Sequence, residues 1–151
     1  MEDVYLHDFM TKERHLAITD LRVGGVIWGD TEPGYIRAPA PDPSSAVRVR
    51  CLIDTGANWC VVSTRLVDDL SLITFDAPPP VTLGPPQERQ EPFPATCITV
   101  VVGRRALSAP AYIRMLPVSA DRYDALIGTT VLQFFRFTYD GPEGAFSLGP
   151  V

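Results

Sequence analysis

The pattern of apolar and polar positions marks six short segments as strands. In each of them apolar residues alternate with polar ones or β-branched residues are concentrated, as is typical of strands. Clusters of proline separate several of the segments and indicate loops, at 39–43, 78–80, 85–86 and 92–94. Many short strands with frequent turns predict a mainly β fold. The predicted strands are 16–23, 47–53, 95–102, 111–116, 137–139 and 145–148.

Two short stretches have the pattern of helices. Ser63 and Thr64 can cap a helix that extends to about Ser71, with its apolar side chains on one face. Thr129 and Thr130 can begin a second helix that extends to about Phe135. We therefore expect one or two short helices beside the strands.

Composition and charge narrow the class of protein. A chain of 151 residues with 46% hydrophobic and 21% charged residues is typical of one globular domain. Its net charge of -5 argues against nucleic acid as a partner, because phosphate binding needs a basic face. The basic pair Arg104-Arg105 follows Gly103 and is predicted to lie in a hairpin turn.

The chain also lacks the marks of secretion, of membrane insertion and of a metal centre. Charged residues such as Glu2, Asp3, Asp8 and Lys12 interrupt any apolar signal segment, and no stretch approaches the roughly 20 apolar residues of a membrane span. We expect a cytoplasmic protein that does not bind a membrane. Its three cysteines should be reduced thiols, and without a ligand-spaced His/Cys cluster we expect no metal and no cofactor.

An acidic residue stands where a buried one would be expected. The stretch RVRCLIDTGANWCVVS, residues 48–63, places Asp54 between two apolar segments that we predict to be buried strands. An ionised carboxylate is costly there unless it is hydrogen-bonded, paired or used in chemistry. One interpretation is a turn carboxylate that bonds its own loop. The other is a catalytic acid.

Two motifs favour the catalytic interpretation through a family resemblance. LIDTGA at 52–57, followed by DALIGTTVLQFF at 124–135, resembles the retropepsin-like aspartic proteases, single-domain relatives of pepsin. The resemblance implies a closed β-barrel of acid-protease fold over residues 30–151, with residues 1–29 as an N-terminal extension. It implies that Asp54, Thr55 and Gly56 form the catalytic turn, and that Leu126-Ile127-Gly128 crosses behind this turn.

The chemistry of this family requires two carboxyl groups. One takes a proton from water while the other protonates the leaving group, and two carboxyls about 3 Å apart share one proton. The sequence contains one Asp-Thr/Ser-Gly turn, since Asp30-Thr31 is followed by Glu32 and Asp140 directly by Gly141. A twofold homodimer would supply the second Asp54.

The resemblance also implies the substrate contacts, which it assigns to Ala57, Leu83, Gly84 and Ile127. A flap should cover the substrate between about 81 and 96, with its tip at 84–94. In this chain the flap has Gly84 among prolines and charged residues, unlike the glycine-rich retroviral flaps. Other residues have structural interpretations: Asp124 as a turn or cap residue, and Trp28 and Trp59 as core or rim aromatics.

Two functional hypotheses follow. The first is a homodimeric aspartic endopeptidase that acts on extended polypeptide with apolar side chains flanking the cleaved bond. The alternative is a catalytically inactive retropepsin-like module for peptide binding or dimerisation. A purely structural barrel would leave the strand-end carboxylate of Asp54 unexplained.

Overall fold

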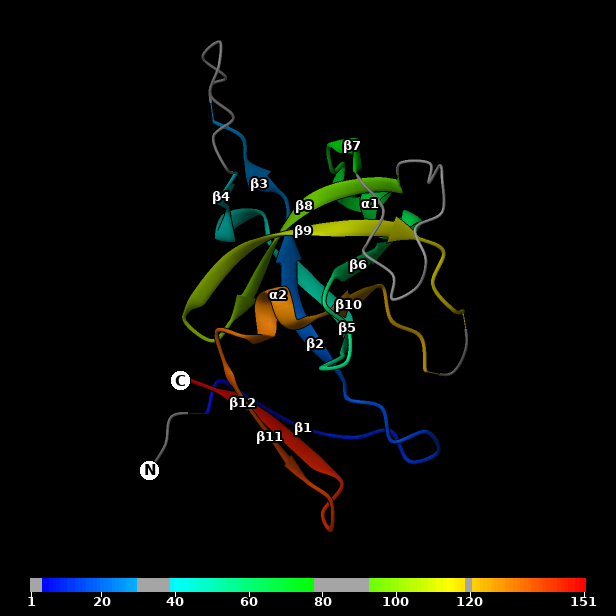
Figure 1. The fold of residues 1–151 in the computed structure, drawn as a ribbon, viewed down its shortest axis with the longest axis vertical. Coiled ribbons are helices and arrows are strands. Elements are labelled where there is room, and N and C mark those ends of the chain that lie inside the picture. The colour runs from blue at the N-terminus through cyan, green and yellow to red at the C-terminus, as the bar shows by residue number, and fades with distance from the viewer. Residues whose placement is uncertain (1–3, 30–38, 78–92, 119–120) are drawn as a thin grey trace, which may run out of the picture.

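The computed structural model describes residues 4–29, 39–77, 93–118 and 121–151. Its main feature is a seven-stranded sheet of order β2-β5-β10-β6-β9-β8-β7, in which β2 also pairs with β8. Six of the strands thereby close into a barrel, and β7 pairs with β8 outside the ring (Figure 1). The described elements are β1 Leu6–Phe9, β2 Ile18–Gly24, β3 Val26–Ile27, β4 Ala40–Pro41, a 3-10 turn Pro43–Ser45, β5 Val47–Ile53, β6 Cys60–Ser63, α1 Thr64–Leu70, β7 Thr74–Ala77, β8 Phe93–Val102, β9 Arg105–Arg114, β10 Ala125–Ile127, α2 Thr129–Leu132, β11 Arg136–Asp140 and β12 Ala145–Gly149.

The barrel has both parallel and antiparallel pairs. β10 runs parallel to β5 and antiparallel to β6, while β6 runs parallel to β9. Side chains that alternate along these strands point inward and form one apolar core, because successive residues of a strand face opposite sides of a sheet. Members of this core with no exposed surface are Val23, Cys51, Cys60, Val62, Ile98, Val100, Ala125, Ile127, Val131 and Leu148.

Buried polar side chains in the barrel are hydrogen-bonded to backbone. The hydroxyl of Thr99 donates to the carbonyl of Gly25 at 2.6 Å, and that of Thr96 to the carbonyl of Ile73 at 2.8 Å. Both threonines lie on β8 and are fully buried. Each bond offsets the cost of removing a hydroxyl from water.

Most predicted elements are confirmed, with shifts at their ends. β5 has the predicted bounds, and α1 is capped as expected, since the Ser63 hydroxyl accepts from the Leu66 N–H at 3.0 Å. β9 begins six residues before the predicted strand because it pairs with β8 from Arg105 to Tyr112. Gly103, with φ 60°, forms the tight turn between them, which confirms the hairpin at Arg104.

The second helix is shorter than predicted. α2 ends at Leu132, and the next two turns are closed by the N–H groups of Phe134 and Phe135, which donate to carbonyls three residues earlier. The chain leaves the helix there to enter β11. The prediction of a mainly β fold with one or two short helices is confirmed.

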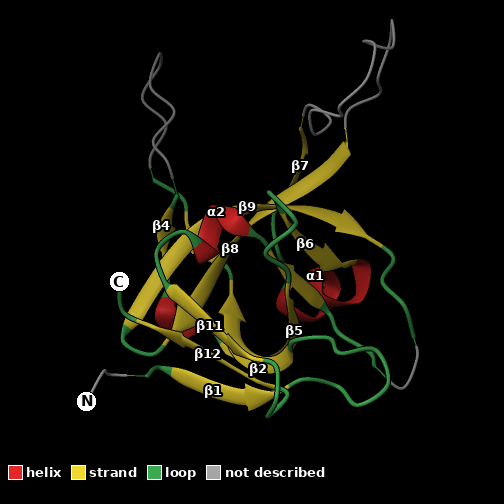
Figure 2. Cartoon of the chain, turned by 60° about the horizontal axis from the view of Figure 1, so that its bottom comes forward, coloured by secondary structure: helices red, strands yellow, loops and turns green. Residues whose placement is uncertain are grey.

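Strands near the two chain ends form a second, three-stranded sheet of order β1-β12-β11, which lies below the barrel in Figure 1 and comes forward in Figure 2. β11 and β12 are a hairpin, and β1 pairs with β12 from Leu6↔Leu148 to Phe9↔Ala145. The segment 1–29 therefore contributes β1 to this sheet and β2 to the barrel. The predicted division of the chain at residue 29 stays a prediction.

The described residues agree with the expected state of the thiols. Cys51 and Cys60 are buried and Cys97 is half-buried, and all three are free. Burial raises the pKa of each thiol above its usual range, which makes it a poor nucleophile. No helix in the described ranges has the length and apolar content that a membrane span requires.

Candidate active site

The turn 54–57 follows directly from the buried end of β5. Ile53 is buried, Asp54 is half-buried, and Thr55 and Gly56 are exposed. The N–H of Gly56 donates to Oδ1 of Asp54 at 2.9 Å, and the N–H of Ala57 donates to the carbonyl of Asp54 at 3.3 Å. These two bonds fix the carboxylate at the strand end. Its second oxygen accepts no hydrogen bond from the described residues and is available to a ligand.

The segment 126–128 lies directly behind this turn, as the resemblance implied. β10 is in parallel register with β5, with Ile127 opposite Ile53. The carbonyl of Ile127 accepts from the N–H of Asp54 at 3.0 Å. On the far side of the turn, the N–H of Thr129 donates to the carbonyl of Ala57 at 2.8 Å. The turn is thus held at both ends by the backbone of one neighbouring segment.

Gly128 is the point of closest approach between the two segments. A Cβ at this position would lie 2.4 Å from the carbonyl oxygen of Trp59 and 2.7 Å from that of Ala57. Both are backbone atoms, which cannot move without moving the turn. Gly128 has φ -98°, so the absence of a side chain is required by space and not by backbone conformation.

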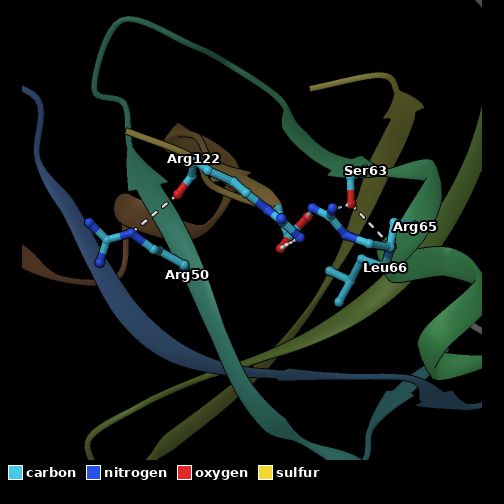
Figure 3. Close-up of polar contacts among 6 residues, drawn as sticks. Arg50, Ser63, Arg65, Leu66 and Arg122 are labelled. Carbon is cyan, nitrogen blue, oxygen red and sulfur yellow. Dashed lines mark hydrogen bonds and ion pairs between the residues drawn. The ribbon is translucent and has the colours of Figure 1, made fainter. Parts of the chain in front are cut away.

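Asp124 joins three barrel strands just before β10. Its N–H donates to the carbonyl of Arg50 at 2.9 Å, and its carbonyl accepts from the N–H of Ser63 at 2.8 Å. Its Oδ1 accepts from the Ser63 hydroxyl at 3.0 Å and forms an ion pair with Arg65 (Figure 3). Its Oδ2 lies 4.0 Å from Nη2 of Arg122. The same hydroxyl caps α1. Asp124 therefore has the structural role expected of it.

The structure describes some of the predicted site residues and not others. Asp54, Thr55 and Gly56 come together in one turn, and Ala57 is half-buried beside them. Ile127 is fully buried, and its carbonyl holds Asp54. Leu83, Gly84 and most of the predicted flap lie outside the described residues; β7 and β8, which flank them, are antiparallel, with Ala77 opposite Phe93.

A row of aromatic side chains begins beside the turn and was not predicted as a unit. The ring of Trp59 meets that of Tyr112 edge-on at 6.1 Å, and Tyr112 meets Phe93 at 6.0 Å. The guanidinium of Arg114 lies 4.8 Å from the centre of the Phe93 ring. The parallel register of β6 and β9 brings Trp59 to Tyr112, and the antiparallel pairing of β8 with β9 brings Phe93 to the same place. Trp59 is 37% exposed and is a rim aromatic, within the range expected for it.

Among the residues that the structure describes, one carboxylate lies at this turn. No hydrogen bond or ion pair joins Asp54 to a second acidic side chain among the residues that the structure describes. The geometry of a single copy thus supplies one carboxylate that is positioned by backbone bonds and open to solvent on one side.

Comparison with known proteins supports the fold. No protein-family model matches the sequence, and no curated protein is significantly similar to it. The structure is similar to the crystal structure of a retropepsin-like aspartic protease from Rickettsia conorii, with a TM-score of 0.53 and 12% sequence identity over 96% of this chain and 89% of that one. The chain has a retropepsin-like fold, with a closed six-stranded barrel and two helices.

The lack of space around Gly128 predicts that even an alanine at this position lowers the stability of the fold. Gly128→Ala should lower the free energy of unfolding by about 1–3 kcal/mol, because the new methyl group meets two backbone carbonyls of the active-site turn. The measurement is urea denaturation followed by circular dichroism. Gly141→Ala is the control, since its nearest neighbour would be a Tyr139 ring atom at 3.6 Å. Equal stability of the two variants would contradict this account of the turn.

The Asp124 network predicts a second difference in stability. Asp124→Ala removes the partner of Arg65 and of the Ser63 hydroxyl, and should cost about 1–3 kcal/mol. Asp121→Ala is the matched control: its side chain is 22% exposed against 21% for Asp124, but its described contact is a 4.0 Å ion pair with Arg14. That pair should contribute at most about 1 kcal/mol. Thermal unfolding of both variants compares them, and a larger loss for Asp121→Ala would refute the assignment.

Proposed function

We propose that the chain is an aspartic endopeptidase that acts as a homodimer. The observation that carries the proposal is the position of Asp54 at a strand end in a retropepsin-like fold. Its carboxylate accepts from the N–H of Gly56, and its own N–H donates to the carbonyl of Ile127. A second copy related by a twofold axis would contribute the other carboxylate. Polypeptide is the proposed substrate, without nucleic acid or membrane.

The proposed reaction uses one water and one shared proton. A water molecule between the two Asp54 carboxyls gives a proton to the ionised one while its oxygen attacks the carbonyl carbon of the peptide bond. The protonated carboxyl gives its proton to the carbonyl oxygen, which produces a tetrahedral diol. When the C–N bond breaks, the leaving nitrogen takes a proton from one Asp54 and a diol hydroxyl returns one to the other, so that the pair again holds one proton.

The neighbours of Asp54 have distinct proposed roles. Thr55 is exposed in the single chain, as a residue would be whose hydroxyl bonds to the partner's backbone across the axis. Gly56 positions Asp54 through its N–H and lets the two turns approach. Ala57, Leu83 and Gly84 are the proposed substrate contacts, whereas Ile127, which the sequence also suggested for this role, is fully buried and is proposed to act behind the turn through its carbonyl. The apolar character of this set favours an extended polypeptide with apolar side chains flanking the cleaved bond.

One observation favours the alternative of an inactive module that binds peptide or dimerises. The bond from the Gly56 N–H to Asp54 Oδ1 is the local turn bond that a purely structural carboxylate would also make. A structural role would account for the hydrogen bond that Oδ1 accepts. It would not account for the second oxygen, which accepts no hydrogen bond from the described residues, and we therefore favour catalysis.

Substitution of the carboxylate tests the proposal. Asp54→Asn keeps the shape of the side chain but cannot accept the water proton, and should lower the rate of cleavage by at least about 10²–10⁴-fold. The assay is cleavage of unfolded casein over a pH series, with and without a pepstatin-type transition-state mimic.

A matched control separates chemistry from a general effect of charge. Asp69→Asn removes one negative charge from an exposed position of α1 and should leave cleavage unchanged. Full activity of Asp54→Asn would remove this residue from the mechanism. Absence of cleavage by the wild type at every pH would favour the inactive module.

A further inference from the structure

An open cleft lies between the start of β1 and the barrel strands β2, β5 and β8. Its volume is about 490 Å³, within the range of roughly 300–1,000 Å³ that is typical of small-molecule sites. Arg48, which lines it, stands near the start of β5, whereas Asp54 follows the end of the same strand. About 20 Å of extended chain separates the two residues. The cleft is therefore distinct from the candidate active site.

The barrel register places two arginines directly opposite each other in this cleft. Arg22 of β2 lies opposite Arg48 of β5, and Val101 of β8 lies opposite Arg22 on its other side. Both arginines face outward, because the residues that follow them, Val23 and Val49, belong to the core. Like charges that are directly opposed on neighbouring strands are destabilising. An anion bound between the two guanidinium groups would remove this repulsion.

The charges of the cleft do not balance. Asp20 accepts from Nε of Arg48 at 2.7 Å and forms an ion pair with that guanidinium. Arg22 has no ion pair with any described residue, and its Nη2 donates to the carbonyl of Pro43 at 3.1 Å. Two arginines against one aspartate leave one positive charge in excess, in a chain whose net charge is -5. This excess matches an anion of single charge better than a phosphate dianion.

Apolar side chains line the rest of the cleft, and the ring of Tyr5 is held firmly among them. A Cβ on Gly103 would lie 2.4 Å from this ring, which shows how closely the ring covers the β8–β9 turn. The ring also meets that of Phe135 edge-on at 6.3 Å, and the N–H of Tyr5 donates to the carbonyl of Leu148 at 2.9 Å. With Leu6 it gives the cleft an apolar wall that is already in place without a ligand.

We propose that this cleft binds a carboxylate carried on an apolar body. Guanidinium groups bind carboxylates through paired, charge-assisted hydrogen bonds, and the apolar wall would cover the adjoining hydrocarbon. Two sources have this chemistry: a free aliphatic acid, and the C-terminal carboxylate of a peptide that ends in apolar residues. The inference is independent of the proposed function, because Asp54 takes no part in it.

Titration with octanoate tests the site. In the nitrogen-15 NMR spectrum of the full chain, octanoate should shift the amide signals of residues 5–6, 20–22 and 101–103. Octanamide has the same hydrocarbon chain without the charge, and should bind at least about tenfold more weakly. Equal binding of the two compounds would overturn the role of the arginines.

Substitution of the arginine without an ion pair tests the charge requirement. Arg22→Gln should weaken octanoate binding by at least about tenfold, and Arg22→Lys should weaken it less, because lysine keeps the charge but not the planar fork. Arg14→Gln is the control: it removes one charge from a side chain that is 64% exposed and does not line the cleft, and should leave binding unchanged. Thermal unfolding of each variant shows that it is folded.

A carboxylate built into the protein gives a second test that keeps both arginines. Val101→Glu places an acidic side chain directly opposite Arg22 and should compete with octanoate, again by at least about tenfold. Val101→Gln has the same size without the charge and should bind octanoate more tightly than Val101→Glu. If Val101→Glu bound octanoate as tightly as Val101→Gln, the site would not be at Arg22.

A peptide arm identifies the source of the carboxylate. The probe is N-acetyl-Ala-Val-Leu with a free C-terminal carboxylate, and its C-terminal amide is the control. Binding of the free peptide and not of the amide would support a peptide end as the ligand, and binding of octanoate alone would support a free aliphatic acid. Absence of binding by either carboxylate at millimolar concentration, or binding that Arg22→Gln leaves unchanged, would overturn the inference. Neither result depends on whether casein is cleaved.

Discussion

The candidate active-site turn depends on two backbone hydrogen bonds to one neighbouring segment. Ile127 accepts from the N–H of Asp54, and Thr129 donates to the carbonyl of Ala57, so residues 127–129 hold the turn at both ends. This contact requires Gly128, because any side chain would enter the space of the Trp59 and Ala57 carbonyls. The position of the carboxylate is therefore set by backbone geometry, which side-chain motion cannot relax.

Hydrogen bonds of Asp124, just before β10, help to hold this contact in place. β10 is only three residues long, and its register with β5 is fixed just before it begins, where the backbone of Asp124 bonds to Arg50 and Ser63. The Asp124 carboxylate extends the same connection to the start of α1 through the Ser63 hydroxyl. A short strand between two such anchors delivers Ile127 and Gly128 to the turn in one arrangement.

The turn and the segment behind it were predicted through the family resemblance of two short motifs, both of which stand out locally in the sequence. Asp54 interrupts an apolar strand, and Gly128 follows an apolar pair just before two threonines that begin a helix. The two C-terminal strands, predicted at 137–139 and 145–148, were found from the local pattern of apolar residues. β1 was missed, since His7 and Asp8 give its four residues a polar character that suits an exposed edge. The first half of β9 was missed because Arg105 and Pro110 resemble loop residues.

The aromatic row could not be predicted because it depends on which strands are neighbours. A period of two shows that a segment is a strand but does not identify its partner. The parallel register of β6 and β9 brings Tyr112 beside Trp59.

The central claim is that one active centre needs Asp54 from two copies of the chain. The most direct test adds the Asp54→Asn variant to a fixed amount of wild type under conditions of free subunit exchange. Mixed dimers contain one carboxylate, so an equal amount of the variant should reduce casein cleavage by about half, and larger amounts should reduce it further. Cleavage that stays constant while the variant is added, with mixed dimers shown to form, would contradict the claim.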